Sequence, residues 1–210
     1  MRVVFGGTIA LNEIELELEE GIVGLFGPNG SGKTTLLRVL CGLLPPSSGD
    51  VLFEGLPLDL RDESLRRRIG YAGHAAGLYD TLTARENLEL FAHLYGAAAR
   101  VQEIIDGLDL SVVAGARVGN LSAGFVRRVA VARALVHDPD LLLLDEPYAN
   151  LDDEASEVVS RAIRAWHSPG KIAVIATHGA KRVRAFADAG IVLRRGEIAS
   201  FRSSFAPEPV

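Results

Sequence analysis

Gly27-Pro28-Asn29-Gly30-Ser31-Gly32-Lys33-Thr34-Thr35 fits G-x-x-x-x-G-K-[ST], the pattern of a phosphate-binding loop between a strand and a helix. The glycines let the backbone curl so that its N–H groups point at phosphate oxygens. Lys33 adds a positive charge near the β- and γ-phosphates, and the Thr34 hydroxyl can ligate Mg²⁺. The alternative interpretation is a glycine turn that simply precedes a helix.

The sequence around this loop predicts an α/β fold. Residues 22–26 are a short apolar run suited to a buried strand, and a helix is expected over residues 33–42. Residues 12–19 alternate apolar with acidic residues, which predicts a half-buried, antiparallel N-terminal strand. Further strands are expected at residues 51–53, 69–72, 141–144, 172–176 and 191–193, before a short tail with two prolines. Strands alternating with helices predict a mainly parallel sheet.

A helical lobe is predicted within this core, over residues 75–137 or so. Thr83 and Glu86 match a capping box, and apolar residues follow at helical spacing. A second helix is expected over residues 100–108. Ser122 is placed to cap a third helix, which Asp138-Pro139 ends.

Composition limits the class of protein. The chain has 210 residues, of which 48% are hydrophobic and 23% charged, so we expect one folded domain over residues 1–210. The net charge of −5 argues against a broad basic face for nucleic acid. The lone Cys41 excludes a disulfide within the chain, which suits a reducing compartment. We see no signal peptide and no apolar run near the roughly 18–20 residues that span a bilayer, so a soluble chain is expected.

Three polar residues follow apolar strands that we expect to be buried. Asp145 at a strand tip can hold Mg²⁺, and Glu146 then lies where a base could orient the water that attacks a γ-phosphate. His178 follows another strand and could donate to a γ-phosphate oxygen. The alternatives are a solvated acidic turn and a structural histidine. Because ligands bind at strand tips in open sheets, we favour the functional interpretation.

The order of these motifs resembles the ATP-binding subunits of ABC transporters along the whole chain. Residues 27–34 match the Walker A loop, residues 121–125 the signature motif and residues 141–145 Walker B. Glu146 matches the catalytic glutamate, residues 149–152 the D-loop, and His178 the switch histidine. Phe5 is placed like the aromatic residue that stacks on adenine, with strand packing as its alternative.

What the resemblance implies is a P-loop NTPase of the ABC ATPase type, with an N-terminal antiparallel β subdomain and an inserted helical lobe. Two copies would form a head-to-tail homodimer that sandwiches ATP and Mg²⁺, with Ser122, Ala123, Gly124 and Asp152 acting in trans. An integral membrane permease would be the partner, docked on the lobe around residues 83–95, and nucleic acid would not be one. The chain would then lie peripherally at the cytoplasmic face of the cell membrane.

Two motifs depart from the family pattern. His74 stands where a glutamine usually helps to position Mg²⁺, so it is either a metal-site residue or an inert loop histidine. In the signature, Ala123 and Phe125 replace the usual glycine and glutamine, while Ser122 and Gly124 are kept. Three features are similar to the haem-exporter ATPase subunits of cytochrome c maturation: Gly73-His74, the Leu-Ser-Ala-Gly signature at residues 121–124 with Arg-Arg-Val-Ala at residues 127–130, and the short chain. In those subunits a glutamine usually follows the histidine, and here Ala75 stands instead.

We therefore expect an ATPase subunit that powers a membrane exporter. Multidrug- or lipid-type export is an alternative to haem export. A soluble ABC-type ATPase acting on DNA or the ribosome is another, although residues 35–120 hold no heptad insertion and the chain carries one motif set. A module that responds to ATP without hydrolysing it is the third alternative.

Overall fold

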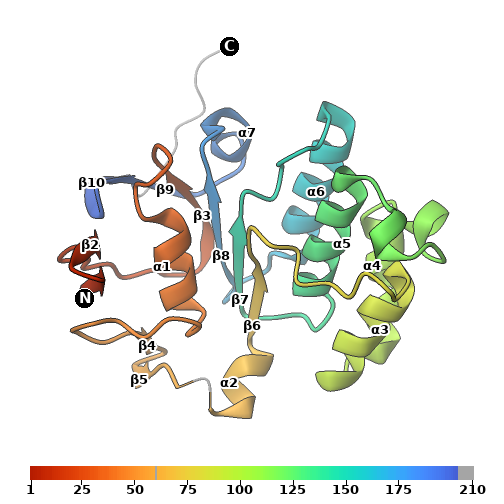
Figure 1. The fold of residues 1–210 in the computed structure, drawn as a ribbon, viewed down its shortest axis with the longest axis horizontal. Coiled ribbons are helices and arrows are strands. Elements are labelled where there is room, and N and C mark those ends of the chain that lie inside the picture. Colours follow the sequence, from red (N-terminus) through yellow and green to blue (C-terminus); the bar gives the residue numbers. More distant parts are fainter. Residues whose placement is uncertain (60, 203–210) are drawn as a thin grey trace.

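A six-stranded sheet forms the centre of the molecule, with helices on both of its faces (Figure 1). The computed structural model describes residues 1–59 and 61–202. In sheet order the strands are β10 (Glu197–Arg202), β9 (Ala189–Arg194), β3 (Gly21–Phe26), β8 (Ile172–Thr177), β7 (Leu141–Asp145) and β6 (Ile69–Ala72). All neighbours pair in parallel except β10 with β9. The sheet therefore points five carboxyl ends to one edge.

Alternation along each strand divides the core into two layers. In β7, Leu142 and Leu144 face the layer under helices α5 (Ala123–Leu135) and α6 (Asp153–Trp166), whereas Leu141 and Leu143 face helix α1 (Lys33–Leu40). Both faces of β7 are buried, as is usual for the central strand of a parallel sheet. This explains why its sequence is an unbroken run of leucines.

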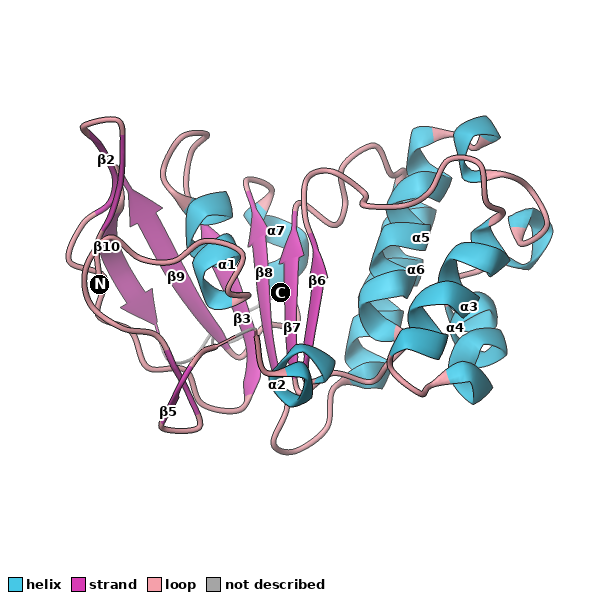
Figure 2. Ribbon diagram, turned by 60° about the horizontal axis from the view of Figure 1, so that its bottom comes forward, coloured by secondary structure: helices cyan, strands magenta, loops and turns pink. Residues whose placement is uncertain are grey.

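The predicted helical lobe lies beyond α5 and α6, farthest from β10 (Figure 2). It is built from α3 (Ala84–Leu94) and α4 (Val101–Gly107), with the 3-10 turns Ala98–Arg100, Ser111–Val113 and Val118–Asn120. Thr83 and Glu86 form the expected capping box, in which the Thr83 N–H donates to the Glu86 carboxylate at 2.7 Å. Helix α3 packs on α5, so α5 joins the lobe to the sheet.

Smaller elements surround the sheet. Two antiparallel hairpins, β1 (Val3–Phe5) with β2 (Thr8–Leu11) and β4 (Leu52–Phe53) with β5 (Leu56–Pro57), form the β subdomain that the resemblance implied. The short helices α2 (Glu63–Arg67) and α7 (Ala180–Arg184) complete the described fold. Among residues 1–59 and 61–202, no helix is both long enough and apolar enough to cross a membrane.

Two predictions about strands were wrong. Residues 12–19 do not form a strand, although Ile14 is buried and the glutamates beside it are exposed. Glu13 has a φ of 49°, and this segment has no adjacent strand to pair with in the described sheets. The alternation of apolar and acidic residues therefore reflects alternating burial, without the hydrogen bonds of a β-sheet. The segment after residue 193 is not simply a tail, because residues 197–202 return as β10. The two prolines at positions 207 and 209 lie outside the described residues.

The central strand makes a quantitative prediction. Leu143 is fully buried between the sheet and α1, so Leu143→Ala should lower the free energy of unfolding by about 2–5 kcal/mol, through lost contacts and a cavity. Leu94→Ala is the matched control because Leu94 is 58% exposed, and it should change stability by about 0.5 kcal/mol at most. Urea denaturation measures both variants. Equal losses would show that β7 is not the packed centre.

Candidate functional site

The loop of residues 27–35 connects β3 to α1, as predicted, and its curvature requires glycine. Gly27 has a φ of 150°, and a Cβ there would lie 2.3 Å from the Leu193 carbonyl oxygen. Gly32 has a φ of 105°, and its Cβ would lie 2.8 Å from Leu11 Cδ2. Larger side chains at either position would displace backbone or core. Pro28, Asn29 and Gly30 form the exposed rim of the loop, and Thr35 is half-buried in α1.

Two polar side chains lie inside the loop, and one of them lacks a described partner. The Lys33 side chain lies within the loop's own curve, where Nζ donates to the carbonyls of Gly27 at 2.8 Å and Pro28 at 3.2 Å. The Ser31 hydroxyl is buried and has no hydrogen-bond partner among the described residues. A buried polar atom without a partner is costly, and an anion seated in the loop would give this one a partner.

Thr34 and Asp145 bring the loop to the end of β7. The Thr34 hydroxyl donates to Asp145 Oδ2 at 2.7 Å, and Asp145 is only 2% exposed. A hydroxyl and a carboxylate side by side offer the hard oxygen ligands that Mg²⁺ prefers. The described residues contain no cluster of three or more metal-ligating acids, histidines or cysteines. This fits Mg²⁺, which usually takes one or two carboxylates and completes its shell with water and phosphate oxygens.

Glu146 and His178 are in direct contact. Glu146 Oε1 lies 2.9 Å from His178 Nδ1 and accepts a hydrogen bond from the His178 N–H at 2.9 Å. The Thr177 hydroxyl donates to Glu146 Oε2 at 3.0 Å. Glu146 itself has a φ of 51°, an uncommon conformation for a non-glycine residue that turns the chain sharply after β7. The two predicted catalytic residues therefore form one hydrogen-bonded unit.

Sheet order is what brings these residues together. Strands β3, β8, β7 and β6 are consecutive neighbours, and the phosphate loop, His178, Asp145-Glu146 and Gly73-His74 follow their respective carboxyl ends. The edge of the sheet seen at the top of Figure 1 thus collects residues from four distant parts of the sequence.

Ser122, Ala123 and Gly124 lie on the other side of the sheet from α1, at the start of α5. Ser122 caps this helix, since its hydroxyl accepts from the Phe125 N–H at 3.4 Å, and Ser122 and Ala123 are exposed. A Cβ on Gly124 would lie 3.1 Å from the Asn150 carbonyl, so this helix start packs on the turn before α6. Within the described chain, no hydrogen bond joins these three residues to the phosphate loop.

Asp152, Phe5 and His74 lie at the edges of the site. Asp152 caps α6 by accepting from the Ala155 N–H at 2.7 Å. Phe5 ends β1 and is 49% exposed, so its ring is available to a ligand. His74 is exposed just after β6, and among the described residues no hydrogen bond joins it to Thr34 or Asp145.

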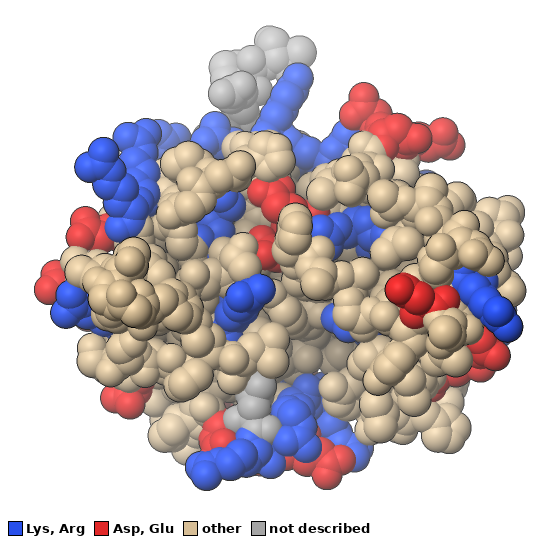
Figure 3. All heavy atoms as spheres, viewed as in Figure 1, with Lys and Arg blue, Asp and Glu red and all other residues tan. Residues whose placement is uncertain are grey.

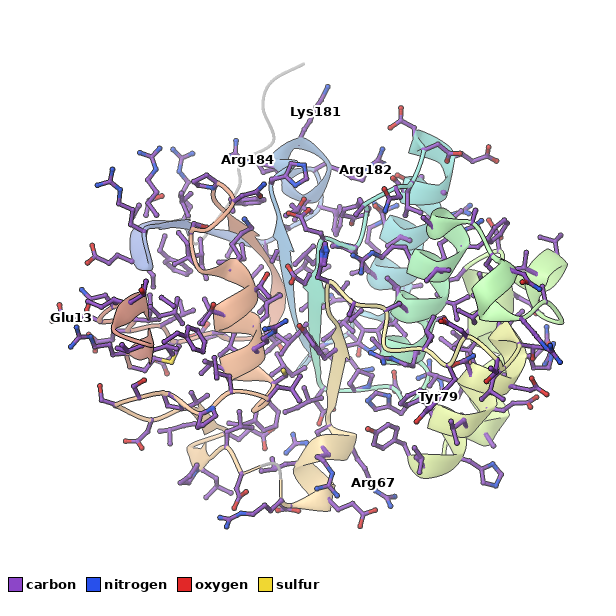
Figure 4. The ribbon with its side chains drawn as sticks, in the orientation of Figure 1. Glu13, Arg67, Tyr79, Lys181, Arg182 and Arg184 are labelled. Atoms are coloured by element: carbon purple, nitrogen blue, oxygen red, sulfur yellow. The ribbon has the colours of Figure 1, made fainter. Side chains whose placement is uncertain are left out.

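Basic side chains border this edge. Figure 4 shows Lys181, Arg182 and Arg184 of α7 above the strand ends. Arg182 pairs with Asp153 of α6 at 2.7 Å, and the Arg184 guanidinium lies 5.2 Å from the centre of the Phe26 ring. The face in Figure 3 mixes both signs, with acidic atoms at its upper right and basic atoms at its upper left and top centre. Positive charge there favours an anionic ligand, although the chain as a whole is acidic.

Sequence reasoning missed several residues of the site. Thr177 holds the Glu146 carboxylate, and its place directly before His178 was a signal that could have identified it. The β9–β10 turn supports the phosphate loop, since the Gly196 N–H donates to the Ser31 carbonyl at 3.0 Å. A cleft of about 730 Å³ lies between Pro28 and this hairpin. No local pattern signalled that contact, because it joins residues more than 160 positions apart.

Comparison with known proteins agrees with this geometry. Residues 11–149 match the family model described as ABC transporter. The ABC transporter ATP-binding protein NatA of Bacillus subtilis (strain 168) is 36% identical over 196 residues, which are 90% of this chain and 80% of that protein. The Nod factor export ATP-binding protein I of Cupriavidus metallidurans is 37% identical over 184 residues, covering 85% of this chain but only 61% of that protein. The chain therefore spans less than two thirds of this Nod factor relative and four fifths of NatA.

Solved structures share the fold. A dimeric ATP-binding cassette in a post-hydrolysis state, bound to ADP and Pi, superposes with a TM-score of 0.86 at 30% identity, covering 96% of this chain and 94% of that one. The cbiO1 protein of Clostridium perfringens, part of the ABC transporter complex cbiONQ, superposes with a TM-score of 0.80 at 27% identity, covering 96% and 85%. The motif order, the site and these relatives together show that the chain belongs to the ABC transporter family, as an ATP-binding ABC ATPase domain.

Proposed function

We propose that the chain binds and hydrolyses ATP and thereby powers a membrane exporter. The observation that carries this proposal is the Thr34–Asp145 hydrogen bond at 2.7 Å, beside a phosphate loop whose Ser31 hydroxyl is buried without a described partner. When bound, Mg²⁺ would neutralise negative charge that develops during phosphoryl transfer. Thr34 and Asp145 would hold that ion.

Each remaining residue of the edge has a proposed role. Lys33 and the N–H groups of residues 27–35 bind phosphate oxygens, for which Lys33 exchanges its bonds to the loop carbonyls. Glu146 accepts the proton of the attacking water, and His178 contacts the γ-phosphate. Their 2.9 Å contact holds the Glu146 carboxylate until substrate binds. Phe5 stacks on adenine, and His74 takes the place of the usual glutamine at the metal.

Two copies of the chain would complete each site. Ser122 and Ala123 are exposed at a helix N-terminus, a position suited to anions, and Gly124 and Asp152 lie beside them. No residue in the described part of the chain hydrogen-bonds them to the phosphate loop, so we propose that they contact the nucleotide of a partner protomer. The dimeric cassette described above supports this arrangement.

The lobe is the proposed docking surface for the membrane subunit, around residues 83–95. Leu90 and Leu94 of α3 are 37% and 58% exposed, and Tyr79, labelled in Figure 4, is 55% exposed nearby. Exposed apolar groups of this kind mark interaction sites. The chain would then lie peripherally at the cytoplasmic face of the membrane, as one domain over residues 1–210.

Export is the proposed direction of transport. NatA and the Nod factor relative are 36% and 37% identical to this chain, and the latter carries export in its name. Haem export is the narrower proposal. It rests on Gly73-His74, on the signature at residues 121–124 with residues 127–130, and on the short chain. Both relatives described above are named for other roles. Copurification of the membrane subunit and identification of its cargo would test this narrower proposal.

Glu146→Gln tests the catalytic assignment. Glutamine keeps the shape of the side chain: its oxygen can accept from the His178 N–H and its amide can donate to the Thr177 hydroxyl. The fold and ATP binding should therefore persist, while phosphate release should fall by about a hundredfold or more because the base is lost. Steady-state phosphate release and equilibrium binding of a fluorescent ATP analogue measure the two effects.

Glu154→Gln is the matched control, since Glu154 is an exposed glutamate on α6 and should leave turnover unchanged. Wild-type turnover in Glu146→Gln would remove Glu146 from the mechanism. If the unmodified chain bound ATP but released no phosphate even with its membrane subunit, the chain would be an ATP-responsive module instead.

Ser122→Arg tests the shared site. The arginine side chain should block the face that a partner's nucleotide would occupy, so turnover should be lost while monomers still bind ATP. Ser111→Arg, at another exposed serine of the lobe, should be nearly neutral. Loss of ATP binding by isolated Ser122→Arg monomers, with helix content intact by circular dichroism, would instead place Ser122 in the site of its own chain.

A further inference from the structure

Two arginines of α5 hold the loop of residues 73–77 by its backbone. Arg127 Nη1 donates to the Gly73 carbonyl at 2.8 Å, and Arg133 Nη1 donates to the Gly77 carbonyl at 2.6 Å. Arg133 Nη2 also donates to the Tyr71 carbonyl, at 2.6 Å. A single helix therefore binds both ends of the loop that follows β6.

Arg127 is an unusual member of this pair because it is almost fully buried. It is 7% exposed, and burial lowers the pKa of its guanidinium from the ordinary value. The nearby charges of Asp145 and Glu146 act in the opposite direction and favour the charged form. A buried cation needs hydrogen-bond acceptors, and the Gly73 carbonyl is the one that Arg127 has among the described residues. This hydrogen bond is consequently expensive to break.

The third arginine of the helix is a contrast. Arg128 Nη1 also donates to backbone carbonyls, those of Leu108 at 3.2 Å and Asp109 at 3.3 Å, but these belong to the lobe itself. Its guanidinium lies 4.4 Å from the centre of the Phe125 ring. Arg128 thus holds α5 within the lobe, whereas Arg127 and Arg133 connect α5 to the edge of the sheet.

The loop of residues 73–77 connects the edge of the sheet to α5 through its hydrogen bonds. The loop leaves β6 next to β7, which carries Asp145, and it contains the exposed His74. Ser122 caps the N-terminus of α5. It lies five residues before Arg127, and so about 7.5 Å away along the helix. A force on the first turn of α5 therefore reaches the Gly73 carbonyl through one short, rigid helix segment.

We propose that Arg127 is a positioning residue that ties the loop of residues 73–77 to α5, so that the position of His74 follows that of α5. Arg133 holds the far end of the loop in the same way. The inference rests on the proposed function in one respect: a nucleotide of the partner protomer would act on Ser122. Through Arg127, a nucleotide bound in the partner's site would then change the position of the loop of residues 73–77, which lies beside the chain's own site.

The test compares Arg127→Met with Arg128→Met, both in the Glu146→Gln background. Each variant removes one α5 guanidinium that is hydrogen-bonded to backbone, so a general loss of stability should be similar. Amide hydrogen exchange over residues 73–77 is measured first without nucleotide. Arg127→Met should speed exchange there by about tenfold or more, and Arg128→Met should leave it unchanged.

The second measurement adds Mg-ATP and follows dimer formation by light scattering. The Glu146→Gln parent and Arg128→Met should both dimerise and change exchange over residues 73–77, whereas Arg127→Met should dimerise without that change. Arg127→Lys keeps the charge and one donor, so it should restore part of the response. It also serves if Arg127→Met fails to fold.

Specific outcomes would overturn the proposal. Equal exchange over residues 73–77 in Arg127→Met and Arg128→Met without nucleotide would show that Arg127 does not tie the loop. A full ATP response in a dimerising Arg127→Met or Arg127→Lys, equal to that of the parent, would show that the signal does not pass through it. Failure of the parent to dimerise would overturn the shared site of the proposed function and the nucleotide response with it, while the tie itself would be judged by the measurement without nucleotide.

Discussion

The hydrogen bond from Thr34 to Asp145 is the constraint on which the site depends. It joins the first turn of α1 to the tip of β7, residues 111 positions apart in the chain. It can form only because β8 alone separates β3 from β7, and because all three strands run in the same direction. Parallel pairing delivers every strand's carboxyl end to one edge, which is where ligands bind in open α/β sheets.

The same constraint explains how buried and reactive residues coexist in one strand. Leu141 to Leu144 are held on both faces by the two core layers, so the strand is rigid up to its last residue. Asp145 is then presented at a fixed position, and the positive φ of Glu146 turns the next carboxylate toward Thr177 and His178. Packing of the apolar run therefore sets the geometry of the two acids.

The lobe is attached to this edge through α5. That helix packs on β6 and on α3, and its arginines bind the carbonyls of the loop after β6. Arginine side chains are long and end in several hydrogen-bond donors, so they can hold a loop whose backbone is not paired in a sheet. The chain thereby gains a link between the exposed start of α5 and the catalytic edge without a separate element for it.

Features that depend on interactions between nearby residues could be predicted from the sequence, and features that depend on distant contacts could not. Local features were readable: the glycine loop, the capping box at Thr83, the cap at Ser122 and the leucine strand each follow from interactions within a few residues. Alternation at residues 12–19 was a true signal of burial, yet a strand needs a partner, and none lies beside that segment in the described sheets. Tertiary structure alone decided the order β3-β8-β7-β6, the contact of Glu146 with His178, the support of Ser31 by Gly196 and the hold of Arg127 on Gly73. Those contacts join segments that are distant in sequence, and pairing between strands, unlike a turn or a cap, leaves no local pattern that specifies its partner.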